Sequence, residues 1–161
     1  MKKVIIIGVG NILRRDDGVG VHVIKELVGA SASGGHVPLQ LPNGVEVYDG
    51  GLGGFKLLDL IDGAKKAIFI DAIEMGLPPG SVRVFSPQEV VSLLSASGGQ
   101  RCSLHDTDLL EVIKFAETLD DTPEIKIVGI QPANVESGLE LSVPVKDSIP
   151  RTVQLILDII R

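Results

Sequence analysis

The sequence predicts an α/β fold: a three-layer sandwich in which a twisted, mostly parallel five-stranded sheet carries helices on both faces. Short runs of β-branched residues alternate along the 161-residue chain with segments whose apolar residues recur at helical spacing. Aromatic residues make up only 3% of the chain and Trp is absent, so the core must be aliphatic, as is typical of buried parallel strands. No repeat or linker divides the sequence, and we expect one domain, residues 1–161.

Five strands are expected from the pattern of apolar residues. The first, residues 4–7, is a continuous β-branched run, which predicts burial on both faces of the sheet. The fourth follows a short turn that contains two prolines and a glycine, and we expect it to run antiparallel to the third strand at an edge. The remaining strands are predicted at residues 45–49, 67–71, 81–85 (the fourth) and 124–130.

Five helices are expected between and after these strands. Ser86 is a candidate N-cap with Pro87 at the first helical position, Gly63 ends the second helix, and Pro150 is placed in the first turn of the last one. The predicted helices cover residues 19–28, 55–61, 87–94, 106–119 and 148–160.

Charge and composition narrow the classes of function. The formal net charge of −6 argues against a nucleic-acid-binding protein. A single Cys allows no intramolecular disulfide and fits a reducing compartment. The apolar runs at both ends are too short to cross a bilayer, and the first lacks a signal-peptide cleavage pattern. We therefore expect a soluble, cytoplasmic protein without membrane insertion.

Ligands of open α/β sheets bind outside the carboxyl ends of the strands, which selects residues 8–17, 49–54 and 71–75. Asp71 ends the most apolar strand, where a carboxylate is costly to bury unless other groups satisfy it. Asp16 and Asp17 are adjacent, so we do not expect both side chains to turn inward at once. Taken alone, they fit a pair that caps the helix beginning near Val19, where the helix dipole favours negative charge.

His105 lies beside a predicted helix start and close to Cys102. Together with Asp17 and Asp71 it forms a reasonable ligand set for a borderline divalent ion such as nickel or zinc. No HExxH or CxxC spacing supports such a site locally, so the fold must bring the three residues together. A Cys102 nucleophile assisted by His105 is the competing enzymatic interpretation, but no third, orienting group is evident.

The turn Gly8-Val9-Gly10-Asn11 after the first strand leaves a second class of function open, a nucleotide- or small-ligand-binding module. The dinucleotide fingerprint requires a third Gly, and Leu13 occupies that position. Asp16 and Asp17 would also place negative charge beside a phosphate. The alternative explanation is a tight turn between strand and loop, in which glycines relieve steric limits.

The segment from Gly8 to Gly20, GVGNILRRDDGVG, resembles the opening signature of hydrogenase maturation endopeptidases. Further stretches that resemble this family follow in the same order and extend over nearly the whole chain. They are Asp49-Gly50-Gly51, Ile70-Asp71-Ala72 with Pro79-Gly80, Cys102-Ser103-Leu104-His105, Gly129-Ile130-Gln131-Pro132 and Gly138-Leu139-Glu140-Leu141-Ser142.

The resemblance implies an endopeptidase that removes the C-terminal extension of a nickel-iron hydrogenase large-subunit precursor after nickel insertion. It implies Asp17, Asp71 and His105 as catalytic and metal-contacting residues, with Asp16 and Asn11 as possible accessory residues. The family often has Glu at the position of Asp17 and Thr at that of Leu52. Two roles for the ion are open. Either it activates the attacking water, or it belongs to the substrate and signals that nickel has been inserted into the precursor. We favour the second role, and we expect that other divalent ions can bind in vitro.

Overall fold

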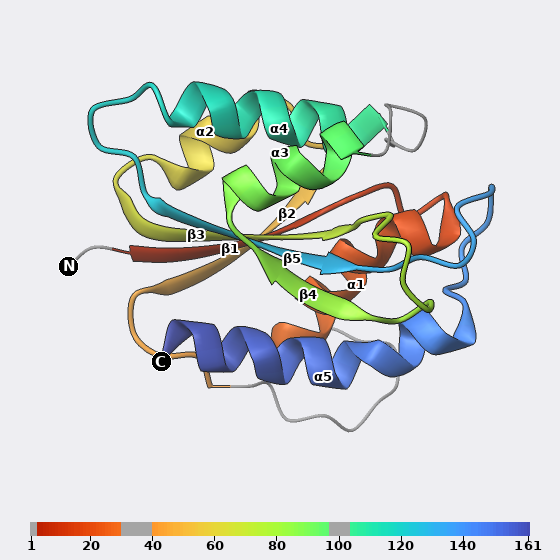
Figure 1. Ribbon diagram of the computed structural model, residues 1–161. Helices are drawn as coiled ribbons and strands as arrows, with labels where there is room; N and C mark the ends of the chain where they lie inside the picture. The colour runs from red at the N-terminus through yellow and green to blue at the C-terminus, as the bar shows by residue number, and fades with distance from the viewer. Residues whose placement is uncertain (1–2, 30–39, 97–103) are drawn as a thin grey trace.

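The computed structural model describes residues 3–29, 40–96 and 104–161, with the backbone alone for residues 104–108. The chain folds as a five-stranded sheet in the order β2-β1-β3-β5-β4 (Figure 1). Four strands are parallel, and the fifth, β4, pairs antiparallel with β5. The strands are β1 Lys3–Val9, β2 Val45–Gly51, β3 Ala64–Ala72, β4 Val82–Phe85 and β5 Glu124–Ile130. The predicted fold class is confirmed.

The fourth strand lies at an edge and runs antiparallel, as predicted, but its neighbour differs from the expected one. β3 already pairs with β1 on one side and β5 on the other, so β4 cannot join it. It pairs with β5 instead, beginning at Val82 opposite Ile130. Gly80 N–H donates to Gln131 O and Gln131 N–H donates to Ser81 O, which extends this ladder beyond the strand ends.

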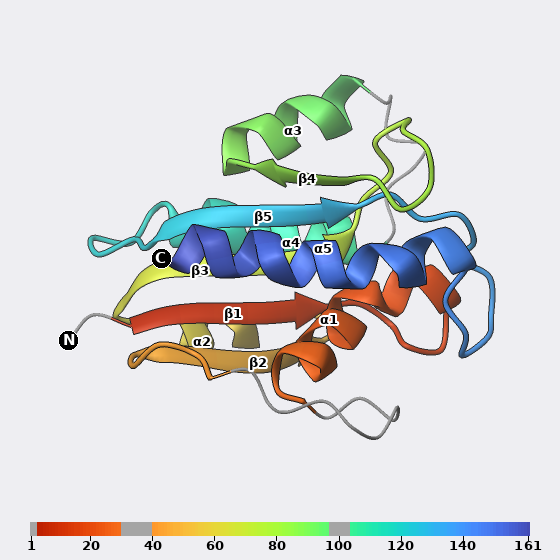
Figure 2. The ribbon, with the colours of Figure 1, turned by 90° about the horizontal axis from the view of Figure 1, so that it is seen from below.

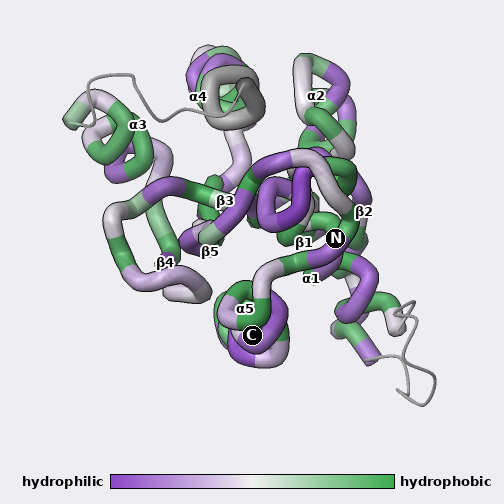
Figure 3. Tube along the Cα trace, turned by 90° about the vertical axis from the view of Figure 1, so that its right-hand side faces the viewer, coloured by the Kyte–Doolittle hydropathy of each residue, from purple (hydrophilic) through white to green (hydrophobic). Residues whose placement is uncertain are grey.

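Helices cover both faces of the sheet (Figures 1 and 2). One face carries α1 and α5, and the other carries α2, α3 and α4, as the end-on view in Figure 3 also shows. A short 3₁₀ helix, η1, precedes α1 in the loop after β1. The bounds are η1 Arg15–Gly18, α1 Val19–Leu27, α2 Lys56–Ile61, α3 Pro87–Ala96, α4 Leu104–Ala116 and α5 Val143–Ile160.

The two apolar layers follow from the alternation of side chains along the strands. In β1, Ile5 and Ile7 belong to the cluster beneath α2, α3 and α4, whereas Ile6 belongs to the cluster beneath α1 and α5. All three are buried. Burying an isoleucine side chain contributes about 1.5–3 kcal/mol, so continuous apolar runs are the pattern that a sheet covered on both faces requires.

α3 begins at Pro87 as predicted, whereas α4 differs from its predicted bounds at both ends. α3 begins with a capping box, in which Glu89 N–H donates to Ser86 Oγ and Ser86 N–H donates to Glu89 Oε1. α4 starts at Leu104, two residues earlier than expected, and ends at Ala116. Beyond Ala116 the chain continues as a 3₁₀-type turn, in which Leu119 N–H donates to Ala116 O three residues back.

The last helix was predicted to begin at residue 148, with Pro150 in its first turn, and this boundary is wrong. α5 begins at Val143, and Pro144 is the proline that occupies its first turn. Pro150 lies inside the helix on its exposed side. A proline there removes one backbone donor, but the buried face of α5, including Val145, Val153 and Ile156, holds the helix on the sheet. Among the described residues, no helix is long and apolar enough to span a bilayer.

Candidate functional site

Asp71 lies at the carboxyl end of β3, the central strand, and its side chain is fully buried. In the parallel register, Asp71 is opposite Gly129 of β5, and the preceding Ile70 is opposite Gly8 of β1. Asp71 Oδ1 accepts a hydrogen bond of 2.8 Å from the N–H of Ala72. This bond fixes the rotation of the carboxylate at the edge where β1, β3 and β5 end.

Asp17 is carried to the same edge by the loop that follows β1. Asn11 shapes this loop as an Asx turn, because its side-chain oxygen accepts from Leu13 N–H at 2.9 Å. The backbone N–H of Asn11 donates to Asp17 Oδ2 at 3.1 Å. Asp17 is buried, so its side chain is shielded from solvent in the loop directly after β1.

Glycines allow the close packing that brings these two segments together. A Cβ at Gly10, whose φ is +139°, would stand 2.0 Å from the carbonyl oxygen of Asp17. A Cβ at Gly8 would stand 2.3 Å from Gly20 O, and one at Gly20 would stand 2.2 Å from Ile70 O. The start of α1 therefore lies directly on the ends of β1 and β3. The space above the Gly-x-Gly turn is filled by the chain's own backbone.

Asp16 and Asp17 are both buried, so the expectation that they cap α1 is wrong. The N-cap of α1 is Gly18, which has no side-chain cap bond. Asp16 turns inward to the segment after β5, where Ala133, Asn134 and Ser142 supply hydrogen-bond donors. Burial by itself would raise the pKa of Asp16, but these hydrogen bonds outweigh it and hold the pKa below its usual value.

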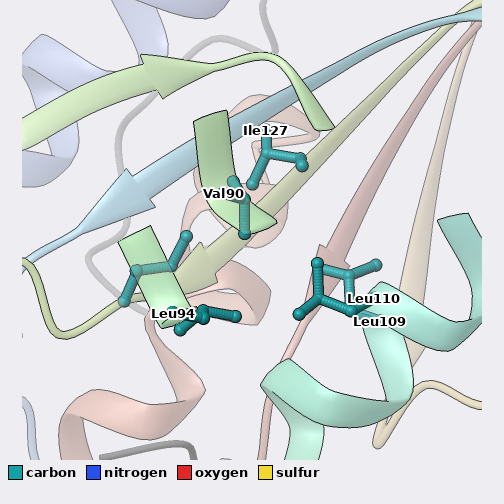
Figure 4. Close-up of a pocket in the computed structure, with 6 residues that line it drawn as sticks. Val90, Leu94, Leu109, Leu110 and Ile127 are labelled. Atoms are coloured by element: carbon teal, nitrogen blue, oxygen red, sulfur yellow. The ribbon is translucent and has the colours of Figure 1, made fainter. Parts of the chain in front are cut away.

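His105 lies in the first turn of α4, and its side chain falls outside the described residues, as does Cys102. The position of α4 is nevertheless informative. Leu109, one turn after His105, lines an apolar pocket with Val90 and Ile127 (Figure 4). Ile73, two residues after Asp71, lines the same pocket. The first turns of α4 thus lie near the end of β3. Among the side chains that the structure describes, no three His, Cys, Asp or Glu residues form a metal-binding group.

Gln131 is a functional candidate that the sequence analysis did not single out as an individual residue. Its buried side chain accepts hydrogen bonds at Oε1 from Met75 N–H at 2.7 Å and from Leu77 N–H at 3.3 Å. Gln131 therefore holds the segment that leaves β3 just after Asp71. The sequence feature that could have identified Gln131 is its position directly after the apolar run of β5, because a polar side chain buried there needs hydrogen-bond partners.

The segments after β1 and β5 also expose apolar side chains beside this edge. Leu13 is 60% exposed and Leu139 is 67% exposed, although both segments are tied together by backbone hydrogen bonds. Exposed apolar side chains that gather on ordered segments are typical of a surface that binds another protein. The five residues concerned are Ile12, Leu13, Val135, Leu139 and Val143.

Comparison with known proteins gives a consistent result. A family model described as hydrogenase maturation protease matches residues 21–159. The hydrogenase expression/formation protein HupD of Bradyrhizobium diazoefficiens is 33% identical over 155 residues, which cover 95% of this chain and 75% of HupD. The coenzyme F420 hydrogenase subunit delta of Methanothermobacter thermautotrophicus is 30% identical over 163 residues, covering 97% of this chain and 93% of that protein.

Two solved structures are also similar to this chain over almost its whole length. The hydrogenase-maturating endopeptidase HybD from E. coli superposes with a TM-score of 0.84 at 27% identity, over 99% of this chain and 92% of that one. The hydrogenase maturation protease HybD from Thermococcus kodakarensis gives a TM-score of 0.77 at 28% identity, over 99% of both chains.

Proposed function

Because the chain belongs to the hydrogenase maturation protease family, we propose that it removes the C-terminal extension of a nickel-iron hydrogenase large-subunit precursor after nickel has been inserted. The observation that carries this proposal is the placement of Asp17 and Asp71. Both carboxylates are buried at one edge of the sheet, and each accepts a backbone hydrogen bond that fixes its position. Buried acids at the carboxyl ends of parallel strands are typical of a functional site.

The donor set suits nickel that arrives as part of the substrate. Asp17 and Asp71 offer carboxylate oxygens, and His105 would add an imidazole nitrogen from the first turn of α4. Two carboxylates and one imidazole leave coordination positions open, so an ion could be shared with ligands of the precursor. In this proposal the precursor brings the ion to the three side chains, and the scissile bond is then held against the site.

The exposed apolar surface beside the site is consistent with a protein substrate. Ile12 and Leu13 belong to the loop that carries Asp17, and Val135, Leu139 and Val143 follow β5 on the segment bonded to that loop. A macromolecular substrate could cover this surface when its C-terminal segment reaches the two acids. The nucleotide-binding alternative gains no support from the Gly8–Gly10 turn, because a phosphate would need the space that Asp17 O and Gly20 O already occupy.

The experiment that tests the proposal compares nickel-loaded and nickel-free precursor. Each is incubated with the purified protein, and the mass of the precursor is measured over time. We expect the nickel-loaded precursor to lose a single C-terminal segment and the nickel-free precursor to stay intact. Cleavage of both forms at the same rate would contradict a role for nickel in recognition, and cleavage of neither would contradict the proposed activity.

A further inference from the structure

The side chain of Asp16 interacts with a segment that is more than one hundred residues away in the sequence. Its Oδ2 accepts from the N–H groups of Ala133 and Asn134, each at 2.9 Å, and from Ser142 Oγ at 2.7 Å. Its Oδ1 accepts from Ser142 N–H at 2.8 Å. All four donors come from the segment between β5 and α5, so Asp16 joins this segment to the loop after β1.

These contacts occupy the hydrogen-bond acceptor sites of the Asp16 carboxylate. An ionised carboxylate offers about four lone-pair sites, and four donors already occupy Asp16. Ser142 shows how specific the arrangement is. It is the N-cap residue of α5, yet its hydroxyl makes no cap bond and donates to Asp16 instead. Asp16 is therefore arranged to hold protein groups and has no free position for an ion.

The backbone reinforces the same junction. Asp16 N–H donates to Asn134 O at 3.0 Å, Arg15 N–H donates to Gly138 O at 2.9 Å, and Gly138 N–H donates to Leu13 O at 2.8 Å. On the other side, the carbonyl of Asp17 packs against Gly10 so closely that no Cβ would fit there. The backbone of Asp17 is thus enclosed between Gly10 and the segment that Asp16 holds.

We propose that Asp16 is a positioning residue, which clamps residues 133–142 to the loop after β1 and so fixes the Asp17 carboxylate in the orientation that precursor processing requires. The inference rests on the proposed function and assigns Asp16 a role other than that of a metal ligand. Groups that orient a ligand residue in this way affect activity strongly although they do not contact the substrate.

The test is the kinetics of precursor cleavage by Asp16→Asn. The amide keeps the size of the side chain, but its NH₂ group faces backbone donors and cannot accept from them. We expect kcat to fall by about 10- to 100-fold while KM changes by less than about 3-fold, because the surface that binds the precursor is retained. Ser142→Ala removes one of the four donors and should lower kcat less, and Ser142→Thr, which keeps the hydroxyl, should restore it.

A control separates positioning from general loss of stability. Ile125 is buried at the opposite end of the sheet, where β5 begins, and Ile125→Ala removes core volume there. Measured at a temperature at which both variants are folded, Ile125→Ala should keep the wild-type kcat. Wild-type kcat in Asp16→Asn, no difference between Ser142→Ala and Ser142→Thr, or an equal loss in Ile125→Ala would overturn the inference. Failure of the wild type to cleave the precursor would instead remove the proposed function, and this inference with it.

Discussion

Gly20 lies directly against the carbonyl oxygen of Ile70, and a Cβ at Gly20 would stand only 2.2 Å from it. Ile70 immediately precedes Asp71, and Gly20 follows Asp17 by three residues. This contact between the first turn of α1 and the end of β3 places the two acids at one edge. It also explains why a glycine is needed at a helix position where glycine lowers helix stability.

Gly20→Ala should therefore damage both stability and activity. The added methyl group meets backbone atoms that cannot move aside, and overpacking of this kind costs about 1–3 kcal/mol. For a domain of this size each kcal/mol lowers Tm by roughly 2–4 °C, which calorimetry can measure. Lys25→Ala, on the exposed side of the same helix, should change the free energy of unfolding by less than about 0.5 kcal/mol. Equal Tm values for the two variants would contradict the packing argument.

Asp71→Asn and Asp17→Asn should each abolish processing while the chain stays folded. The amide has the size of the carboxylate but lacks its negative charge, so contact with a cation is lost, at a cost of at least about 100-fold in rate. The mass of the nickel-loaded precursor, followed over time, reports the activity, and circular dichroism reports the fold. Asp158→Asn, an exposed acid near the C-terminus, serves as the matched control. Wild-type cleavage by the Asp71 and Asp17 variants would refute the assignment.

His22 should make stability depend on pH. Burial lowers the pKa of His22, with a smaller contribution from the charge of Lys25, and among the described residues its buried Nε2 has no hydrogen-bond partner. The unfolded chain, with a His pKa of about 6.5, then binds a proton more readily than the folded chain. Stability is highest above that pH and falls as the pH drops toward the folded pKa.

The measurement is the free energy of unfolding in urea at pH 7.5, 6.5 and 5.5 for the wild type and His22→Gln. Glutamine cannot titrate, so the loss of stability toward pH 5.5 should be smaller in the variant than in the wild type. Parallel pH profiles for the two proteins would show that burial of His22 does not affect its protonation.

Leu139→Ser tests whether the exposed apolar surface contacts the precursor. Leu139 is 67% exposed, so its replacement should change the free energy of unfolding by less than about 0.5 kcal/mol. Loss of an apolar contact worth about 1.4 kcal/mol in the complex would raise KM for the precursor roughly tenfold. Leu119→Ser alters an exposed leucine just beyond the C-terminus of α4 and should leave KM unchanged. Equal KM values for both variants would exclude Leu139 from the interface.

Much of the fold follows from local patterns. The continuous β-branched run of β1 predicts a strand buried on both faces, and Ser86 followed by Pro87 predicts the start of α3. Contacts between distant segments determined the strand neighbours and helix boundaries that the local patterns did not define. β4 joined β5 because both sides of β3 were occupied, and either Pro144 or Pro150 could have marked the first turn of α5.

The site was predictable only in part for the same reason. Asp71 stands out in the sequence because it ends an apolar strand, and Asp17 was selected by the strand-end rule and by the family resemblance. The environment of Asp16 could not be predicted, because its donors are 117 to 126 residues away in the sequence. A local pattern of two acids before a helix favours a cap, whereas the fold supplies stronger donors from elsewhere.

The central claim is that Asp17, Asp71 and His105 converge on one nickel ion. It is tested most directly by anomalous diffraction at the nickel absorption edge from crystals of this protein soaked in nickel. The account predicts one strong peak at the carboxyl edge of the sheet, within coordination distance of all three side chains, that is lost in Asp71→Asn crystals. A peak elsewhere, or His105 turned away from the two carboxylates, would contradict it.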